Sequence, residues 1–85
     1  MKLAVFTEQF THYKKEDLSS QITGLNSNFF INETPTNNTL NLFWNGHLLK
    51  IGINNDFILS GKIIITNFIP YAGNTLIVEY FYKEI

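Results

Sequence analysis

Residues 39–82, TLNLFWNGHLLKIGINNDFILSGKIIITNFIPYAGNTLIVEYFY, hold the strand and turn signals that decide the fold. Apolar residues alternate from Leu40 to Trp44, Asn45-Gly46 follows, and a second apolar run returns. Asn and Gly both tolerate positive φ, which a type I′ turn requires at both central positions, so this dipeptide between apolar runs predicts a β-hairpin. Because a shift of one residue exchanges the two faces of a strand, the sequence leaves open whether Phe43 or Trp44 faces the core.

Toward the C-terminus, the same stretch predicts a second hairpin and a long last strand. The second hairpin is expected around Ser60-Gly61. Its returning strand, Ile63 to Ile65, is wholly apolar, which favours cover on both faces. Pro70 suits the turn that precedes the last strand, expected from Thr75 to Lys83. Short strands between regular turns, without a helical period, predict an all-β fold, a small antiparallel β-sandwich of about six to seven strands.

The N-terminal part of the chain has a different pattern. Residues 1–21 are interpreted as an extended N-terminal arm, and residues 22–85 as the β-sandwich module. The arm starts with an apolar segment at residues 3–6 and later contains the charged run Lys14-Lys15-Glu16-Asp17. Residues 17–21 are suited to capping a short helical turn, but no amphipathic helix long enough to be stable follows them.

Composition favours a single domain that assembles with other chains. The 85 residues suffice for one domain and are too few for two. Charged residues make up 15% of the chain, below the roughly 25% of an average domain. Low charge combined with many β-forming residues leaves little repulsion between strand edges, so a homo-oligomer is expected. The net charge is -1 and the chain has no Arg, which argues against nucleic-acid binding by a basic surface.

The targeting signals of a secreted or membrane protein are not expected here. The apolar start ends at Thr7-Glu8 and is shorter than the roughly 7–15-residue core of a secretory signal. No run approaches the roughly 18 apolar residues of a membrane span. The chain has no cysteine, so a disulfide framework and a thiolate metal site are excluded. We therefore expect synthesis in a cytoplasm without a signal peptide, and no membrane partner.

Residues that carry catalysis or metal binding are sparse. A metal site needs three or four converging ligands, and the chain offers His12, His47 and seven carboxylates. The run Asn54-Asn55-Asp56 has one carboxylate and is explained by turn formation rather than by calcium binding. No serine lies in a Gly-x-Ser-x-Gly setting, and the glycines are singly spaced turn residues. The expected protein is therefore not an enzyme and carries no metal or cofactor.

Aromatic and apolar side chains are the main candidates for partner contacts. Phe43 and Trp44 are adjacent, so they point to opposite faces of their strand, and one face must be covered by something other than the core. That face is expected to be covered by the arm, by a second copy of the chain or by another partner. Packing of both side chains inside the monomer is the simpler alternative. The candidate partner-binding residues are Leu3, Val5, Phe6, Phe10, Tyr13, Trp44, Tyr71 and Tyr82.

Four segments, taken in order, resemble small β-sandwich modules of virion structural proteins from tailed bacteriophages. They are QITGLNSNFFINETP (21–35), LNLFWNGHLL (40–49), GINNDFILSGKIII (52–65) and PYAGNTLIVEY (70–80). Two positions depart from the usual pattern of these modules. The Asp56-Phe57 pair is displaced by one residue after Gly52, and Asn74 replaces an aspartate. The resemblance covers residues 21–82 and leaves the subfamily open.

The resemblance implies a non-enzymatic structural component of a virion whose partners are major capsid or tail proteins. Such modules occur in capsid decoration, head fibres, necks, baseplates and tail fibres. Capsid decoration is preferred, because fibres normally need a collagen-like or coiled-coil shaft and these 85 residues contain none. The alternatives are a tail, neck or baseplate component and a module that binds a host-surface glycan or protein. For a glycan, the first candidates for stacking are Tyr13, Trp44, Tyr71 and Tyr82.

Overall fold

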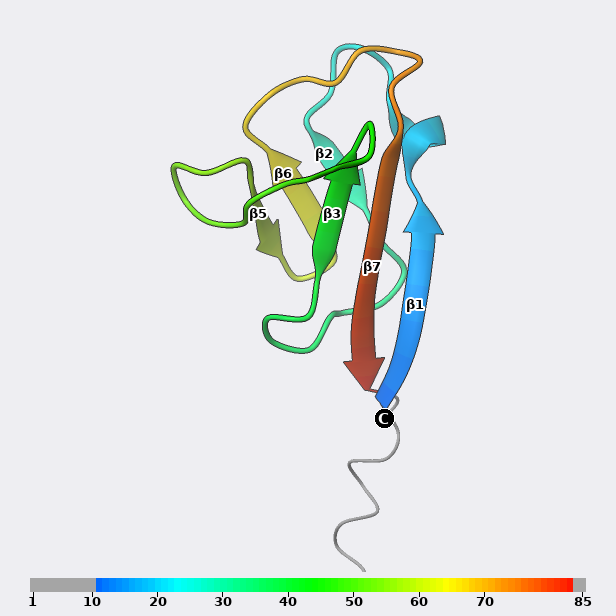
Figure 1. The fold of residues 1–85 in the computed structure, drawn as a ribbon, viewed down its shortest axis with the longest axis vertical. Coiled ribbons are helices and arrows are strands. Elements are labelled where there is room, and N and C mark those ends of the chain that lie inside the picture. The colour runs from blue at the N-terminus through cyan, green and yellow to red at the C-terminus, as the bar shows by residue number, and fades with distance from the viewer. Residues whose placement is uncertain (1–10, 84–85) are drawn as a thin grey trace, which may run out of the picture.

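The structure, a computed structural model, describes residues 11–83 and is a small antiparallel β-sandwich (Figure 1). The strands are β1 (Thr11–Asp17), β2 (Asn28–Phe30), β3 (Asn41–Trp44), β4 (His47–Leu48), β5 (Phe57–Ser60), β6 (Ile63–Thr66) and β7 (Leu76–Lys83), with a 3-10 helix η2 (Ser19–Gln21). One sheet has the strand order β1-β7-β3-β4 and the other has the order β2-β6-β5. The expected all-β sandwich is therefore confirmed. No helix within residues 11–83 is long and apolar enough to span a membrane.

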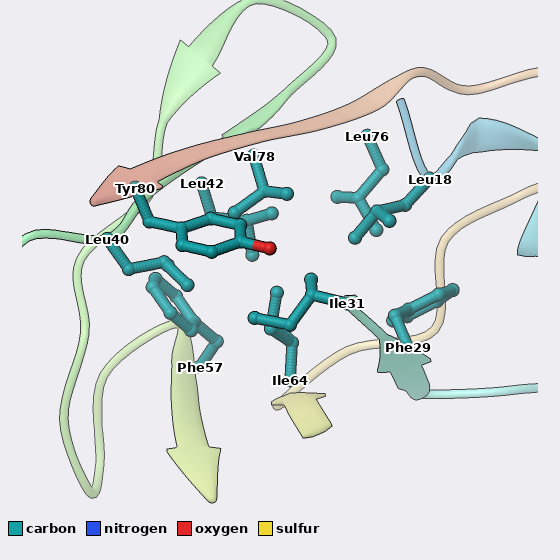
Figure 2. Packing of buried hydrophobic residues seen from close by; sticks show 10 residues of the cluster. All are labelled: Leu18, Phe29, Ile31, Leu40, Leu42, Phe57, Ile64, Leu76, Val78 and Tyr80. Carbon is teal, nitrogen blue, oxygen red and sulfur yellow. The ribbon is translucent and has the colours of Figure 1, made fainter. Parts of the chain in front are cut away.

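The core lies between the two sheets, and alternate residues of the strands supply it. On β7 the residues Leu76, Val78 and Tyr80 are fully buried, whereas the residues between them are partly exposed. This period of two is the signature of a strand with one buried face. Figure 2 shows the β7 side chains directed at Phe29 and Ile64 from the facing sheet. The full buried cluster consists of Leu18, Phe29, Ile31, Leu40, Leu42, Phe57, Ile64, Leu76, Val78 and Tyr80.

The hairpin expected at Asn45-Gly46 is present between β3 and β4. Trp44 pairs with His47, so Asn45 and Gly46 form a two-residue loop. Their φ angles are 51° and 84°, which are the positive values that a type I′ turn requires at both central positions. The loop is also tied to the start of β7, because the Thr75 N–H donates to Asn45 Oδ1 over 2.9 Å.

The second hairpin is displaced by one residue from the expected position. Ser60 is still a strand residue paired with Ile63, so the loop consists of Gly61 and Lys62. Gly61 has a φ of 62° and takes the left-handed position that the turn needs. Ile64 is fully buried and faces the core, whereas Ile63 and Ile65 are only partly buried on the opposite face. The sequence predicts that both faces of this strand are buried, but only the face that carries Ile64 is fully buried.

The ambiguity between Phe43 and Trp44 is resolved by the pairing of β3 with β7. Trp44 lies opposite Leu76 and packs against the core. Phe43 lies opposite Ile77 and points away from the core. The sheet therefore has an outer face that carries apolar side chains, as the adjacent aromatic pair predicts.

Residues 11–21, which the sequence pattern assigned to the arm, lie within the sandwich. β1 pairs with β7 along its whole length, from Thr11 opposite Lys83 to Asp17 opposite Ile77. Leu18 is buried in the core. The expected helical turn is present as η2, and hydrogen bonds from Ser19, including its backbone N–H at 2.9 Å, hold the pKa of the Asp17 carboxyl below its usual value. A truncation meant to leave the sandwich intact must therefore end before Thr11.

Candidate interaction surfaces

The candidate partner residues divide between the two ends of β7. Tyr13 lies opposite Phe81, and Tyr82 follows at the C-terminal end of this strand. Trp44 lies at the opposite end, paired with Leu76. Five residues separate these two positions along β7, about 17 Å at the rise of a strand. Tyr71 lies at the same end as Trp44, in the loop before β7. Four candidates, Leu3, Val5, Phe6 and Phe10, lie outside the described residues.

One end of the sandwich, here named the loop end, is made of residues 22–27, 44–46 and 67–75. Figure 1 shows the first and last of these segments together at the top of the molecule, opposite the C-terminus. They approach closely, because a Cβ added to Gly24 would lie 3.9 Å from the backbone nitrogen of Ala72. None of the three segments contains a charged residue. The loop end is therefore an uncharged surface on a chain whose charges lie elsewhere.

The side chain of Asn74 organises the loop end. Its Oδ1 accepts hydrogen bonds from Trp44 Nε1 over 3.0 Å and from the Tyr71 N–H over 2.9 Å. The Asn74 N–H in turn donates to the Tyr71 carbonyl over 2.9 Å. The Trp44 ring packs against Phe68 with 4.9 Å between the ring centroids. Trp44, expected as a contact residue, is thus half-buried and uses its only polar atom to hold the loop.

Apolar side chains project from the fixed turns of the loop end. Leu25 is 85% exposed, Tyr71 74% and Ile69 51%. The turn that carries Leu25 is held by Asn26, which accepts from the Thr23 N–H over 3.0 Å and donates to the Gln21 carbonyl over 2.9 Å. Loops held in this way lose little entropy on binding, and exposed apolar groups mark interaction sites. The loop end is therefore a candidate docking surface.

Changing Asn74 to alanine is expected to loosen the loop end. The change leaves the Trp44 indole N–H and the Tyr71 N–H without their shared acceptor. We expect a loss of about 1–2 kcal/mol in the free energy of unfolding and a shift in the emission of Trp44, the only tryptophan. Asn74→Asp keeps an acceptor oxygen and is the matched control. Equal urea midpoints and emission spectra for both variants would contradict the role of Asn74.

A second surface, here named the outer face, lies on the four-stranded sheet away from the core. Its described side chains include Tyr13, Lys15, Asp17, Asn41, Phe43, Leu48, Ile77, Glu79, Phe81 and Lys83, as the pairing of β1, β7, β3 and β4 places them. The Tyr13 and Phe81 rings meet edge to face with centroids 5.5 Å apart. A shallow depression of about 390 Å³ lies between Lys15, Phe43, Ile77 and Glu79. The outer face thus combines exposed rings with the charges of Lys15, Asp17, Glu79 and Lys83.

The carboxylate of Glu79 is the polar centre of the outer face. Tyr13 donates its hydroxyl to Glu79 Oε1 over 2.8 Å, and Asn41 Nδ2 donates to Oε2 over 3.3 Å. The hydrogen bond to this carboxylate raises the pKa of the Tyr13 phenol. Tyr13, expected as a partner residue, is thus held in place at 53% exposure. Its ring is fixed before any partner binds.

A partly buried polar contact links β1 to the connection that follows β2. The Tyr80 hydroxyl donates to Glu16 Oε2, which also accepts the Asn32 N–H over 3.0 Å. The Tyr80 oxygen accepts the Glu33 N–H over 3.1 Å. Burial, and then the hydrogen bond to Glu16, raise the pKa of the Tyr80 phenol above its ordinary value. No local pattern in the sequence predicts this contact, since Glu16 and Tyr80 are 64 residues apart.

Among the described residues, those with metal-binding or catalytic potential do not converge. His12 stacks near Tyr82, with 5.3 Å between the ring centroids, whereas His47 is at the opposite end of the sheet beside Trp44. Within residues 11–83, no group of three or more His, Cys, Asp or Glu side chains is placed to hold a metal ion. Asp56 Oδ2 accepts a hydrogen bond from the Lys50 N–H over 2.8 Å. The Asp56 carboxylate therefore stabilises the loop between Lys50 and Asp56.

Comparisons of the chain with protein-family models, with curated proteins and with solved structures found no match. The function is therefore inferred from the residues of this chain and from their arrangement. That arrangement offers two surfaces suited to protein contacts, the loop end and the outer face.

Proposed function

We propose that the protein is a non-enzymatic structural component of a tailed-phage virion, with capsid decoration as its leading position. The observation that carries the proposal is the placement of two candidate contact surfaces, the loop end and the outer face, on one small sandwich. The uncharged loop end lies at one end of β7, and the paired rings of Tyr13 and Phe81 on the outer face lie near the other end. A module of this form can join two components, one through each end.

The low charge of the chain supports an assembled state. Three highly exposed apolar residues at the loop end, Leu25, Ile69 and Tyr71, have no charged residue within their own segments. Exposed apolar groups on two neighbouring loops are typical of protein interfaces in soluble proteins. The resemblance of residues 21–82 to virion modules supplies the kind of partner, a capsid or tail protein. The alternative positions are the tail, neck and baseplate.

Counting copies on the particle tests the proposal. Quantitative mass spectrometry on gradient-purified particles from the source is expected to find this chain at an abundance comparable with the major shell protein. A few copies per particle would support the neck, baseplate or fibre instead. Absence from the particles would overturn the virion proposal.

A second candidate function is binding of a host-surface glycan at the loop end. The observation in its favour is Tyr71, a ring that is 74% exposed at the tip of a fixed turn. Trp44 is less suited to stacking on a sugar, because it packs against Phe68 and its indole N–H is bound to Asn74. A glycan array with the wild type and Tyr71→Ala tests this candidate. Hits that are lost in the variant support it, and an array without hits contradicts it.

A further inference from the structure

Two opposite charges lie side by side on the outer face without forming an ion pair. Lys15 on β1 is the direct cross-strand partner of Glu79 on β7. Both oxygens of Glu79 accept instead from neutral donors, Tyr13 and Asn41. Within residues 11–83, Lys15 makes no side-chain hydrogen bond or ion pair and is exposed. Each charge is therefore available to a group that approaches from outside.

The neighbouring row of the outer face is aromatic. Tyr13 on β1 lies opposite Phe81 on β7, two residues along from the charged pair. The two rings are 53% and 44% exposed. Rings of this size that stay exposed on a fixed sheet are typical of interface anchors. The two strands thus present an aromatic row beside a charged row.

These two rows are self-complementary under a two-fold rotation. An axis that runs along the strands between β1 and β7 exchanges the two strands when a second copy faces the first. Lys15 then lies over Glu79 of the second copy, and Glu79 lies over Lys15 of the second copy. The same rotation places Tyr13 over Phe81 of the second copy. No like charges are brought together in these two rows.

We propose that the outer face of β1 and β7 packs against the same face of a second copy of this chain, with Lys15 and Glu79 paired between copies. This inference rests on the proposed assembly role for its biological setting, whereas dimerisation is measured in solution without any particle. The alternative occupants of this face are the chain's own residues 1–10 and an unrelated virion protein.

The dimer is expected to be weak and dependent on concentration. Each strand of seven or eight residues is roughly 25 Å long, and two adjacent strands are about 10 Å wide. The contact is then on the order of a few hundred Å² per copy, below the roughly 800 Å² per partner of a stable interface. Such a contact is populated when copies are crowded together, as neighbours in an assembly are.

Charge reversal with mixing tests the proposal on the full chain. Sedimentation of the wild type from about ten micromolar to about one millimolar is expected to show a monomer–dimer equilibrium. Lys15→Glu and Glu79→Lys should each weaken it by about tenfold, because each brings like charges together between copies. An equimolar mixture of the two variants should restore association, since every pair across the interface is then of opposite charge. Restoration by mixing separates pairing between copies from pairing within one copy.

Controls keep the outcome interpretable. Lys62→Glu makes the same charge change in the β5–β6 turn, on the other sheet, and should leave the equilibrium unchanged. Should Glu79→Lys fail to fold by circular dichroism, Phe81→Glu at an exposed position is the second variant and should also weaken the dimer. A wild type that stays monomeric up to about one millimolar overturns the proposal. So does a mixture that associates no better than its components.

Discussion

Replacing Tyr80 with phenylalanine is expected to lower the free energy of unfolding by about 1.5–3 kcal/mol. Phenylalanine keeps the ring packing of this fully buried residue and removes only its hydroxyl. The Glu16 carboxylate then loses one of its two donors, and the Glu33 N–H loses its acceptor. Hydrogen bonds to charged groups exceed ordinary ones in strength, so this oxygen contributes more than most. Urea unfolding at neutral pH measures the loss.

The effect of Tyr80 also depends on pH. Its phenol has a raised pKa in the folded protein, so the folded state favours the protonated form. The stabilisation is present in full below the unfolded value of about 10 and is lost as the pH rises above it, at up to about 1.4 kcal/mol per pH unit. The difference in stability between the wild type and Tyr80→Phe should therefore narrow above about pH 10. A constant difference across this range would contradict the assignment.

Tyr82→Phe is the matched control for this prediction. Tyr82 lies on the same face of β7, and its hydroxyl makes no hydrogen bond within residues 11–83. Loss of the Tyr82 hydroxyl should change the free energy of unfolding by no more than about 0.5 kcal/mol. If both variants lose the same stability, the contact between Glu16 and Tyr80 does not carry the effect.

Deleting residues 1–10 is expected to abolish attachment to particles while the sandwich stays folded. The deletion removes the apolar residues Leu3, Val5 and Phe6 and ends just before β1. Every described strand pair is retained, because the first pair joins Thr11 to Lys83. Co-sedimentation of the truncated chain with particles that lack the protein measures attachment. Circular dichroism and the unfolding midpoint measure the fold.

Two further variants separate attachment from folding. A full-length chain with Leu3, Val5 and Phe6 changed to serine keeps the length and should also fail to attach. Deletion of residues 1–14 removes the first four residues of β1, including Tyr13 and its hydrogen bond to Glu79, and should destabilise the sandwich itself. Normal attachment by the chain that lacks residues 1–10 would show that these residues are not the anchor.

The sequence predicts best those parts of the fold that depend on local chemistry. The Asn45-Gly46 hairpin is present with the expected angles, because the two residues themselves tolerate positive φ. The long last strand is also present, since its alternation extends over several residues. The second hairpin differs by one residue, because both Ser60 and Gly61 suit a turn and only the pairing of Ser60 with Ile63 fixes the loop. Local sequence patterns thus determine which strands and turns form, and the pairing between strands determines the residues at which they end.

The parts that depend on distant residues were not predictable from the sequence. The segment from Thr11 to Asp17 is polar and charged, so it lacks the apolar alternation by which a strand is recognised. It is a strand because β7 supplies its hydrogen-bonding partner from the other end of the chain. Of the aromatic candidates, Trp44 is fixed inside the loop end, whereas Tyr71 projects from it. Only the folded arrangement separates a supporting ring from an exposed one.

The pairing of β1 with β7 has a consequence for folding on the ribosome. Sixty residues separate Asp17 from its partner Ile77, so β1 leaves the ribosome on the order of seconds before β7, its neighbour in the sheet, is made. A strand that waits alone with apolar side chains would pair with other nascent chains. The run Lys14-Lys15-Glu16-Asp17 instead keeps the waiting segment in water and discourages wrong partners. The charges of β1 thus protect the nascent chain from wrong strand pairing before the sandwich has formed. Synthesis of β7 then supplies the partner strand that completes the sheet.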